Sequence, residues 1–131
     1  MDKTPAALGF HMPAEWEPHE ATWLGWPHNK TDWPGKFAPI PWVFGEMARK
    51  IAPGEIVRII AAPNVRLQAE RVLTRAGVDL ARIEFLNFAT NRGWTRDFGP
   101  IFVKKNVQPG EVAIARFRFN AWARYSDWQK D

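Results

Sequence analysis

The spacing of apolar residues between positions 21 and 88 restricts this chain to one class of fold. Three short runs rich in β-branched and aromatic residues alternate there with two longer segments whose apolar residues recur every three or four positions. The runs are predicted strands at residues 21–26, 55–61 and 82–88. Because strands that alternate with helices pack into layers, the pattern predicts an α/β fold.

Prolines and glycines set the ends of the first predicted helix. It begins at Pro39 and Pro41, since proline fits a first helical turn where its missing N–H costs nothing, and Pro53-Gly54 ends it. Its apolar face is predicted to comprise Val43, Phe44, Met47 and Ile51.

The second predicted helix opens at Pro63-Asn64 and stops at Gly77. Its apolar face is predicted to comprise Val65, Ala69, Val72, Leu73 and Ala76. Two further strands, at 101–105 and 112–119, are expected to form a hairpin through a turn around 108–110. Residues 1–131 then form a single domain, with residues 1–11 as a loose arm.

Tryptophan is unusually frequent, with eight residues in a chain of 131. Five of them crowd the first third, and a domain this small cannot enclose them all. Some are therefore expected to pack against a surface that this chain does not supply. Sugar binding by exposed tryptophans is a weaker interpretation, because the prolines among them favour packing.

Charge and cysteine content exclude several functions. The net charge is +4, but the basic residues are scattered, which favours a solvated surface over a nucleic-acid interface. No window reaches the roughly 18 apolar residues of a membrane span, and no secretory signal is visible, so a cytoplasmic location is expected. The absence of cysteine removes thiolate nucleophiles and thiolate metal sites. No metal or organic cofactor is indicated.

The segment between Thr90 and Pro100 is the densest candidate site. It lies between two predicted strands, so it is expected to form a loop at a sheet edge, where α/β folds bind ligands. Asp97 can accept two parallel N–H bonds from a guanidinium, and Trp94 can lie against its planar face. Arg96 could orient a neighbouring carboxylate or bond a backbone carbonyl. The residues alone equally allow a capped turn at 96–97 with Trp94 in the core.

Three motifs bear a family resemblance. Residues 12–27 (MPAEWEPHEATWLGWP) closely resemble the opening segment of the agmatine deiminases. Residues 94–100 (WTRDFGP) resemble their W-x-R-D-x-G-P loop, and residues 117–122 (FRFNAW) their F-x-F-N-x-W segment. The motifs occur in the family's order and extend over nearly the whole chain. A bacterial, Porphyromonas-type peptidyl-arginine deiminase branch shares the fold and the loop.

The resemblance implies a fold and a chemistry. The fold is an α/β propeller of the pentein, guanidino-group-modifying type, built from ββαβ units. A Cys thiolate attacks the guanidinium carbon of a small cationic substrate, ammonia leaves, and water releases the product, with a His as acid/base. By resemblance Asp97 holds the guanidinium, Trp94 and Trp122 line the pocket, Arg96 and Gly99 support it, and no cofactor is required.

The departures from the family are equally specific. The family's Glu, His-x-Asp segment and Cys have no counterpart here, and His11, His19 and His28 do not replace the missing base. The sequence after Trp122 departs from the usual Gly-rich continuation. We therefore expect an N-terminal fragment with no catalytic residue, inactive alone. A single propeller segment leaves apolar faces uncovered, and large uncovered patches are unusual on monomers, so the isolated chain is expected to self-associate or to contact a missing C-terminal part. Its parent would convert agmatine to N-carbamoylputrescine and ammonia in putrescine biosynthesis. The alternatives are a non-catalytic guanidinium-binding or assembly module and a peptidyl-arginine deiminase fragment.

Overall fold

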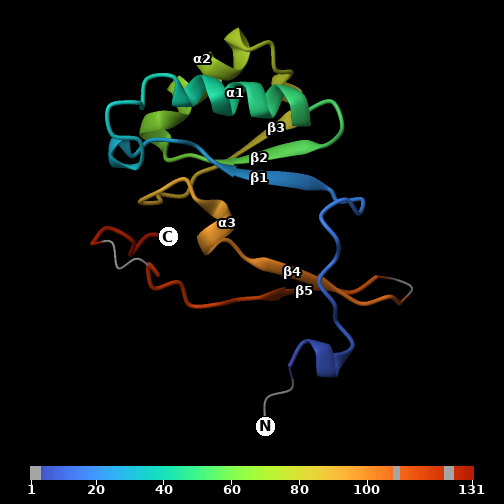
Figure 1. Ribbon diagram of the computed structural model, residues 1–131. Helices are drawn as coiled ribbons and strands as arrows, with labels where there is room; N and C mark the ends of the chain where they lie inside the picture. Colours follow the sequence, from blue (N-terminus) through green and yellow to red (C-terminus); the bar gives the residue numbers. More distant parts are fainter. Residues whose placement is uncertain (1–3, 108–109, 123–125) are drawn as a thin grey trace.

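The computed structural model describes residues 4–107, 110–122 and 126–131 and has an α/β architecture. Its centre is a parallel sheet of three strands in the order β1 (Ala21–Gly25), β2 (Ile56–Ile60), β3 (Ile83–Leu86). Helix α1 (Ile40–Ile51) joins β1 to β2, and α2 (Pro63–Arg75) joins β2 to β3. Both helices cover the same face of the sheet (Figure 1). The α/β class and these five predicted elements are confirmed, with ends that differ by at most two residues.

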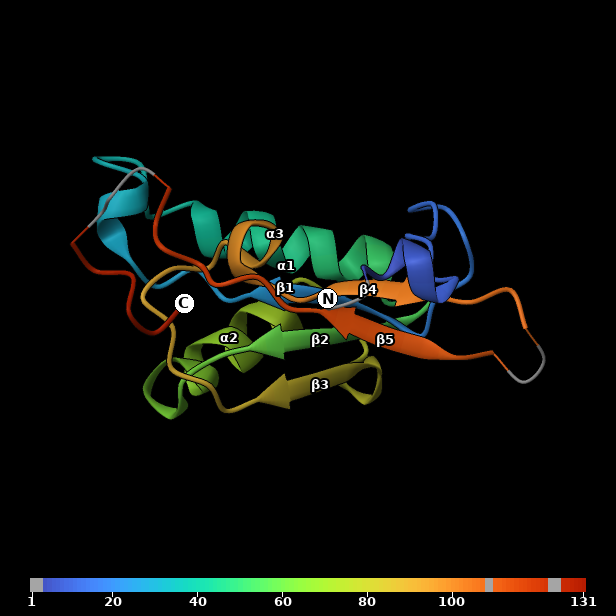
Figure 2. The same ribbon diagram turned by 90° about the horizontal axis from the view of Figure 1, so that it is seen from below.

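A two-stranded antiparallel hairpin lies on the other side of the sheet. It consists of β4 (Ile101–Lys104) and β5 (Val112–Ala115), and a short helix, α3 (Thr95–Phe98), lies between it and the sheet (Figures 1 and 2). The hairpin prediction is confirmed. Part of its expected turn, 108–109, falls outside the described residues.

The predicted strand at 112–119 is too long. Ala115 pairs with Ile101, the first residue of β4, so β5 has no partner strand beyond that point. Pro100 has no N–H to continue the ladder, and the chain before it turns into α3. The structure therefore ends β5 four residues early.

The core lies between the sheet and its two helices. Val57 and Ile59 of β2 are fully buried, as are Leu73 of α2 and Ala48 of α1. The predicted apolar face of α2 is confirmed, because each of its five residues belongs to the core or packs against it. Trp26, which follows β1, is 1% exposed and meets Phe44 of α1 edge-on at 6.3 Å between ring centroids.

The predicted apolar face of α1 is wrong in half of its members. Val43 and Met47 are 50% and 40% exposed, whereas Phe44 and Ile51 pack against the core. The helix instead buries Pro41, Gly45 and Ala48. A Cβ on Gly45 would lie 3.1 Å from Cγ1 of Val72, so small residues allow α1 and α2 to approach closely.

Three single-turn 3-10 helices complete the described chain: Ala6–Leu8, Lys30–Asp32 and Leu80–Arg82. Within the predicted arm, His11 pairs with Lys104 at the edge of β4 through two backbone hydrogen bonds of 2.9 Å. No helix among the described residues is long and apolar enough to span a bilayer.

Candidate functional site

The loop that follows β3 crosses the carboxyl end of β1 at a contact between two glycines. A Cβ on Gly25 would lie 2.7 Å from the carbonyl oxygen of Gly93, and a Cβ on Gly93 would lie 2.7 Å from the carbonyl oxygen of Gly25. Only residues without a side chain can meet so closely. The crossing places the segment at 90–94 over the end of the sheet, where α/β folds commonly bind ligands.

The segment at 95–98 forms one helical turn, α3, rather than the expected loop. The N–H of Gly99 donates to the carbonyl of Thr95 at 2.9 Å, and a Cβ on Gly99 would lie 2.3 Å from that oxygen. A four-residue helix is too short to show apolar periodicity, so the sequence could not reveal it. Gly99 is required for the tight end of this turn, and its role in supporting a binding site stays a prediction.

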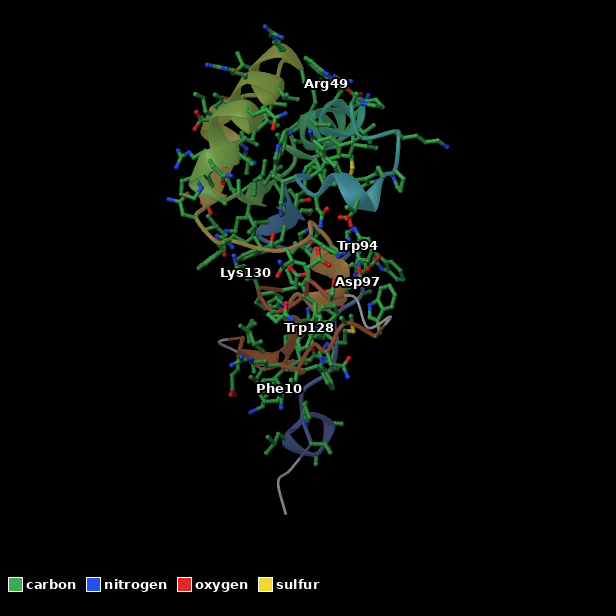
Figure 3. All side chains as sticks on the ribbon, turned by 90° about the vertical axis from the view of Figure 1, so that its left-hand side faces the viewer. Phe10, Arg49, Trp94, Asp97, Trp128 and Lys130 are labelled. Carbon is green, nitrogen blue, oxygen red and sulfur yellow. The ribbon has the colours of Figure 1, made fainter. Side chains whose placement is uncertain are left out.

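Asp97 lies on the exposed side of α3, close to Trp94 (Figure 3). Its backbone N–H donates to the carbonyl of Trp94 at 3.0 Å. Because the side chain is exposed, its carboxylate can accept both N–H groups of an incoming guanidinium. Arg96, its neighbour, forms an exposed ion pair of 2.7 Å with Glu15 of the opening segment. Arg96 therefore meets a carboxylate, one of the two contacts considered for it.

The structure brings Trp94 and Trp122 together. Their ring centroids are 6.0 Å apart and the rings are tilted by only 7°, which is a stacked arrangement. Trp94 is half-buried, and Trp122 is 58% exposed. The two tryptophans, Trp94 from the loop before α3 and Trp122 from the segment after β5, thus form an aromatic platform.

A buried charge cluster beneath this platform was missed by the sequence analysis. Arg92 is 7% exposed, and its guanidinium binds Asp32, whose side chain is 1% exposed, and Asp127 at 2.7 Å. The guanidinium carbon lies 5.4 Å from the centroid of the Trp94 ring. The only signal in the sequence was the position of Arg92 inside the candidate segment, because its partners lie far away along the chain.

The segment at 127–131 is bound to the same loop. One carboxylate oxygen of Asp131 accepts the backbone N–H groups of Asn91 at 2.7 Å and Arg92 at 3.1 Å. The backbone N–H of Lys130 donates to the side chain of Asn91 at 2.8 Å, and Asn29 donates to Asp127 at 3.3 Å. These contacts fix the segment at 127–131 against the loop.

Two carboxylates bind the guanidinium of Arg92, namely those of Asp32 and Asp127. The hydrogen bond from Arg92 holds the pKa of Asp127 below its ordinary value, with the nearby positive charge of Arg92 as a smaller cause. Asp131 binds the backbone of the same loop and not the guanidinium.

His28 links the two strand ends that meet at the site. Its Nδ1 lies 2.9 Å from the carbonyl oxygen of Trp26, and its Nε2 lies 2.9 Å from that of Thr90. Both ring nitrogens are thus engaged by the backbone, which suits a structural link better than proton transfer. His19 is likewise engaged, with Glu17 and Glu55.

Asp97 lines neither of two surface hollows of about 300 and 380 Å³. The residues that line the first include Arg49 and Arg82, and those that line the second include Lys104 and Lys105. No group of three or more metal-ligating side chains gathers within 4–107, 110–122 or 126–131. Asp97 and Trp122 are exposed and therefore accessible to a ligand.

Comparison with known proteins finds one matching family model and several related deiminases. The family model described as Porphyromonas-type peptidyl-arginine deiminase matches residues 11–131. The agmatine deiminase of Stutzerimonas stutzeri (strain A1501) is 35% identical over 136 residues, and the match covers 100% of this chain and 35% of that protein. The agmatine deiminase of Pseudomonas aeruginosa (strain UCBPP-PA14) is 38% identical over 133 residues, covering 98% of this chain and 34% of that protein.

Solved structures give the same result. The agmatine deiminase of Enterococcus faecalis superposes with a TM-score of 0.83 at 26% identity, covering 98% of this chain and 34% of that one. The agmatine deiminase of C. jejuni with substrate bound superposes with a TM-score of 0.74 at 26% identity, covering 92% and 33%. The chain spans about a third of the length of the relatives that it matches.

Proposed function

The chain belongs to the Porphyromonas-type peptidyl-arginine deiminase family, and on that basis we propose that it is the N-terminal part of an agmatine deiminase-like hydrolase. The observation that carries the proposal is an exposed carboxylate, Asp97, three residues after Trp94, whose ring is stacked on that of Trp122 from the segment after β5. The whole enzyme would convert agmatine and water to N-carbamoylputrescine and ammonia, a step of putrescine biosynthesis in the cytoplasm. Its fold would be a pentein propeller, to which this chain contributes one portion.

The chemistry of the site suits a guanidinium. Asp97 would accept two parallel N–H bonds from the planar cation, and the neighbouring tryptophans would line the space around it. The thiolate step needs a cysteine, and this sequence has none. The chain is therefore proposed to bind the substrate without converting it.

Calorimetric titration of agmatine into the chain and into Asp97→Asn tests this function. Charge-assisted hydrogen bonds contribute about 1.5–3 kcal/mol, so Asp97→Asn should weaken binding roughly 10- to 100-fold. Putrescine, a diamine of similar length without a guanidinium, is the control ligand and should bind more weakly than agmatine. Equal affinity of the two proteins for agmatine would remove Asp97 from the site.

A second candidate is supported by the family match itself, whose description names peptidyl-arginine deiminase. In that case the substrate would be an arginine side chain within a peptide. Titration of an arginine with blocked termini, in parallel with agmatine, distinguishes the two candidate substrates. Preference for the blocked arginine would favour the peptidyl branch, and preference for agmatine the small-molecule branch.

A further inference from the structure

We propose that Arg92 is a positioning residue: its buried guanidinium, fixed between Asp32 and Asp127, sets the orientation of the Trp94–Trp122 platform. The proposal rests on the proposed function for what the platform binds, and on geometry alone for how the platform is held. It assigns a role at the candidate site to the buried cluster of Arg92, Asp32 and Asp127.

The first step is that the guanidinium of Arg92 has a fixed place. One of its terminal nitrogens donates to Asp32 and the other to Asp127 at 2.7 Å, so two bonds in different directions define the plane of the group. The Oδ2 atom of Asp32 is buried and accepts no hydrogen bond within the described chain, which makes Arg92 the main compensation for that carboxylate. Removing one partner of such a buried pair is costly, so the arrangement resists displacement.

The second step leads from the guanidinium to the rings. A cation within about 6 Å of an indole centroid is attracted to the ring face by about 0.5–2 kcal/mol. At 5.4 Å, the guanidinium of Arg92 therefore favours one orientation of the Trp94 ring. Trp122 lies parallel to Trp94 at 6.0 Å, so a change in the orientation of Trp94 alters the surroundings of the Trp122 ring.

The backbone of the loop is held separately from the side chain of Arg92. Asp131 accepts the N–H groups of Asn91 and Arg92, and these bonds do not involve the guanidinium. Edge-to-face contacts of Phe119 with Phe98 at 6.2 Å and with Trp128 at 6.3 Å support α3 from the other side. A substitution confined to the guanidinium of Arg92 should therefore move the rings and leave the path of the loop in place.

The sheet offers a matched control. Arg58 also bonds two carboxylates, Glu20 at 2.5 Å and Glu84 at 2.7 Å, and its guanidinium carbon lies 5.7 Å from the centroid of Trp23. Arg58 repeats the chemistry of Arg92 at a position where no stacked pair depends on it. Arg58→Met therefore removes the same kind of interaction without touching the platform.

The test is ¹⁹F NMR of the chain labelled with 5-fluorotryptophan, with the Trp94 and Trp122 resonances assigned by Trp94→Phe and Trp122→Phe. Arg92→Met should shift both resonances, whereas Arg58→Met should shift the Trp23 resonance and leave those two in place. Arg92→Lys keeps the positive charge but loses the planar guanidinium with its two donor nitrogens. Its resonance shifts should therefore lie between those of the unaltered chain and those of Arg92→Met. Unchanged Trp94 and Trp122 resonances in Arg92→Met, with the fold retained by circular dichroism, would overturn the proposal.

A double variant and an agmatine titration complete the test. If Arg92→Met unfolds the chain because Asp32 is left buried and charged, the double variant Arg92→Met/Asp32→Asn removes both charges and should give the same resonance shifts. Agmatine titration adds the functional readout, and loss of the cation–ring contact should weaken binding about tenfold. If the unaltered chain does not bind agmatine, the proposed function fails while the fluorine shifts still decide the role of Arg92.

Discussion

A methyl group is enough to block the crossing of the loop over β1. Gly25→Ala would place a Cβ 2.7 Å from the carbonyl oxygen of Gly93, and backbone cannot yield as a flexible side chain can. We expect the free energy of unfolding to fall by about 1–3 kcal/mol, the usual cost of overpacking, measured by urea denaturation. Gly54→Ala is the control, because its nearest neighbour, the carbonyl of Ile51, is 3.7 Å away. Equal losses in both variants would contradict the crossing.

Acid should weaken the contact between Arg92 and Asp127. The hydrogen bond from Arg92 lowers the pKa of Asp127 from its ordinary value of 3.8. A carboxyl whose pKa is lower in the folded chain stabilises the fold above the unfolded pKa, and this contribution disappears as the pH falls through the folded pKa.

The comparison between the chain and Asp127→Asn isolates this effect. Glu17 and Glu46 also have lowered pKa values, through Lys104 and Arg49, and they contribute equally to both proteins. We expect the unfolding free energy of Asp127→Asn to depend less steeply on pH between about pH 5 and pH 2. Parallel curves for the two proteins would show that Arg92 does not bind Asp127 in solution.

At the scale of single elements, α2 depends on one buried side chain more than on its exposed ones. Leu73 is fully buried between α2 and the sheet, whereas Leu67 on the same helix is 56% exposed. Leu73→Ala should cost about 2–5 kcal/mol, since it removes buried methyl groups and leaves a cavity. Leu67→Ala, the same substitution, should change stability by about 0.5 kcal/mol or less. Thermal or urea unfolding of the two variants checks the difference.

How much of each element could be predicted depended on the size of its core residues. The face of α2 was found because apolar residues that contact the core, Val65, Ala69, Val72, Leu73 and Ala76, recur there every three or four positions. The face of α1 was half missed because Gly45 and Ala48, which bring the helices together, carry almost no apolar signal. Val43 and Met47 carry a strong signal and lie outside. α3 was missed because one turn has no period to detect.

The candidate site was likewise predicted only in part. Asp97 and Trp94 were predicted from a short local string whose residue types suit a guanidinium, and Trp122 was predicted from the family resemblance. The charge cluster could not be found, because it depends on pairs distant in sequence: Arg92 binds Asp32 across 60 residues. Only the fold shows that these charged side chains are in contact. Their importance comes from their burial and not from their positions in the sequence.

At the scale of the whole molecule, the outer face of α1 should cause self-association. Trp42, Val43 and Met47 are 46%, 50% and 40% exposed, although they are large and apolar. Exposed apolar patches favour contact with another surface, so we predict that the mean mass by light scattering rises with concentration. Val43→Glu should reduce this rise. Gln68→Glu, which adds the same charge to the exposed side of α2, should not, and a clean monomer at high concentration would contradict the prediction.

The charge cluster also has a consequence for the order in which contacts can form during synthesis on the ribosome. The three parallel strands and the two helices that join them are all synthesised before residue 90, and each strand pairs with the next strand along the chain, so the sheet can assemble on the nascent chain. Asp32 is synthesised with them, but its ion pair cannot form before Arg92 has been added. The hydrogen bond from Asn29 to Asp127 needs a residue that is added 98 positions later. The contacts beneath the Trp94–Trp122 platform therefore form only after the scaffold that carries them has been synthesised.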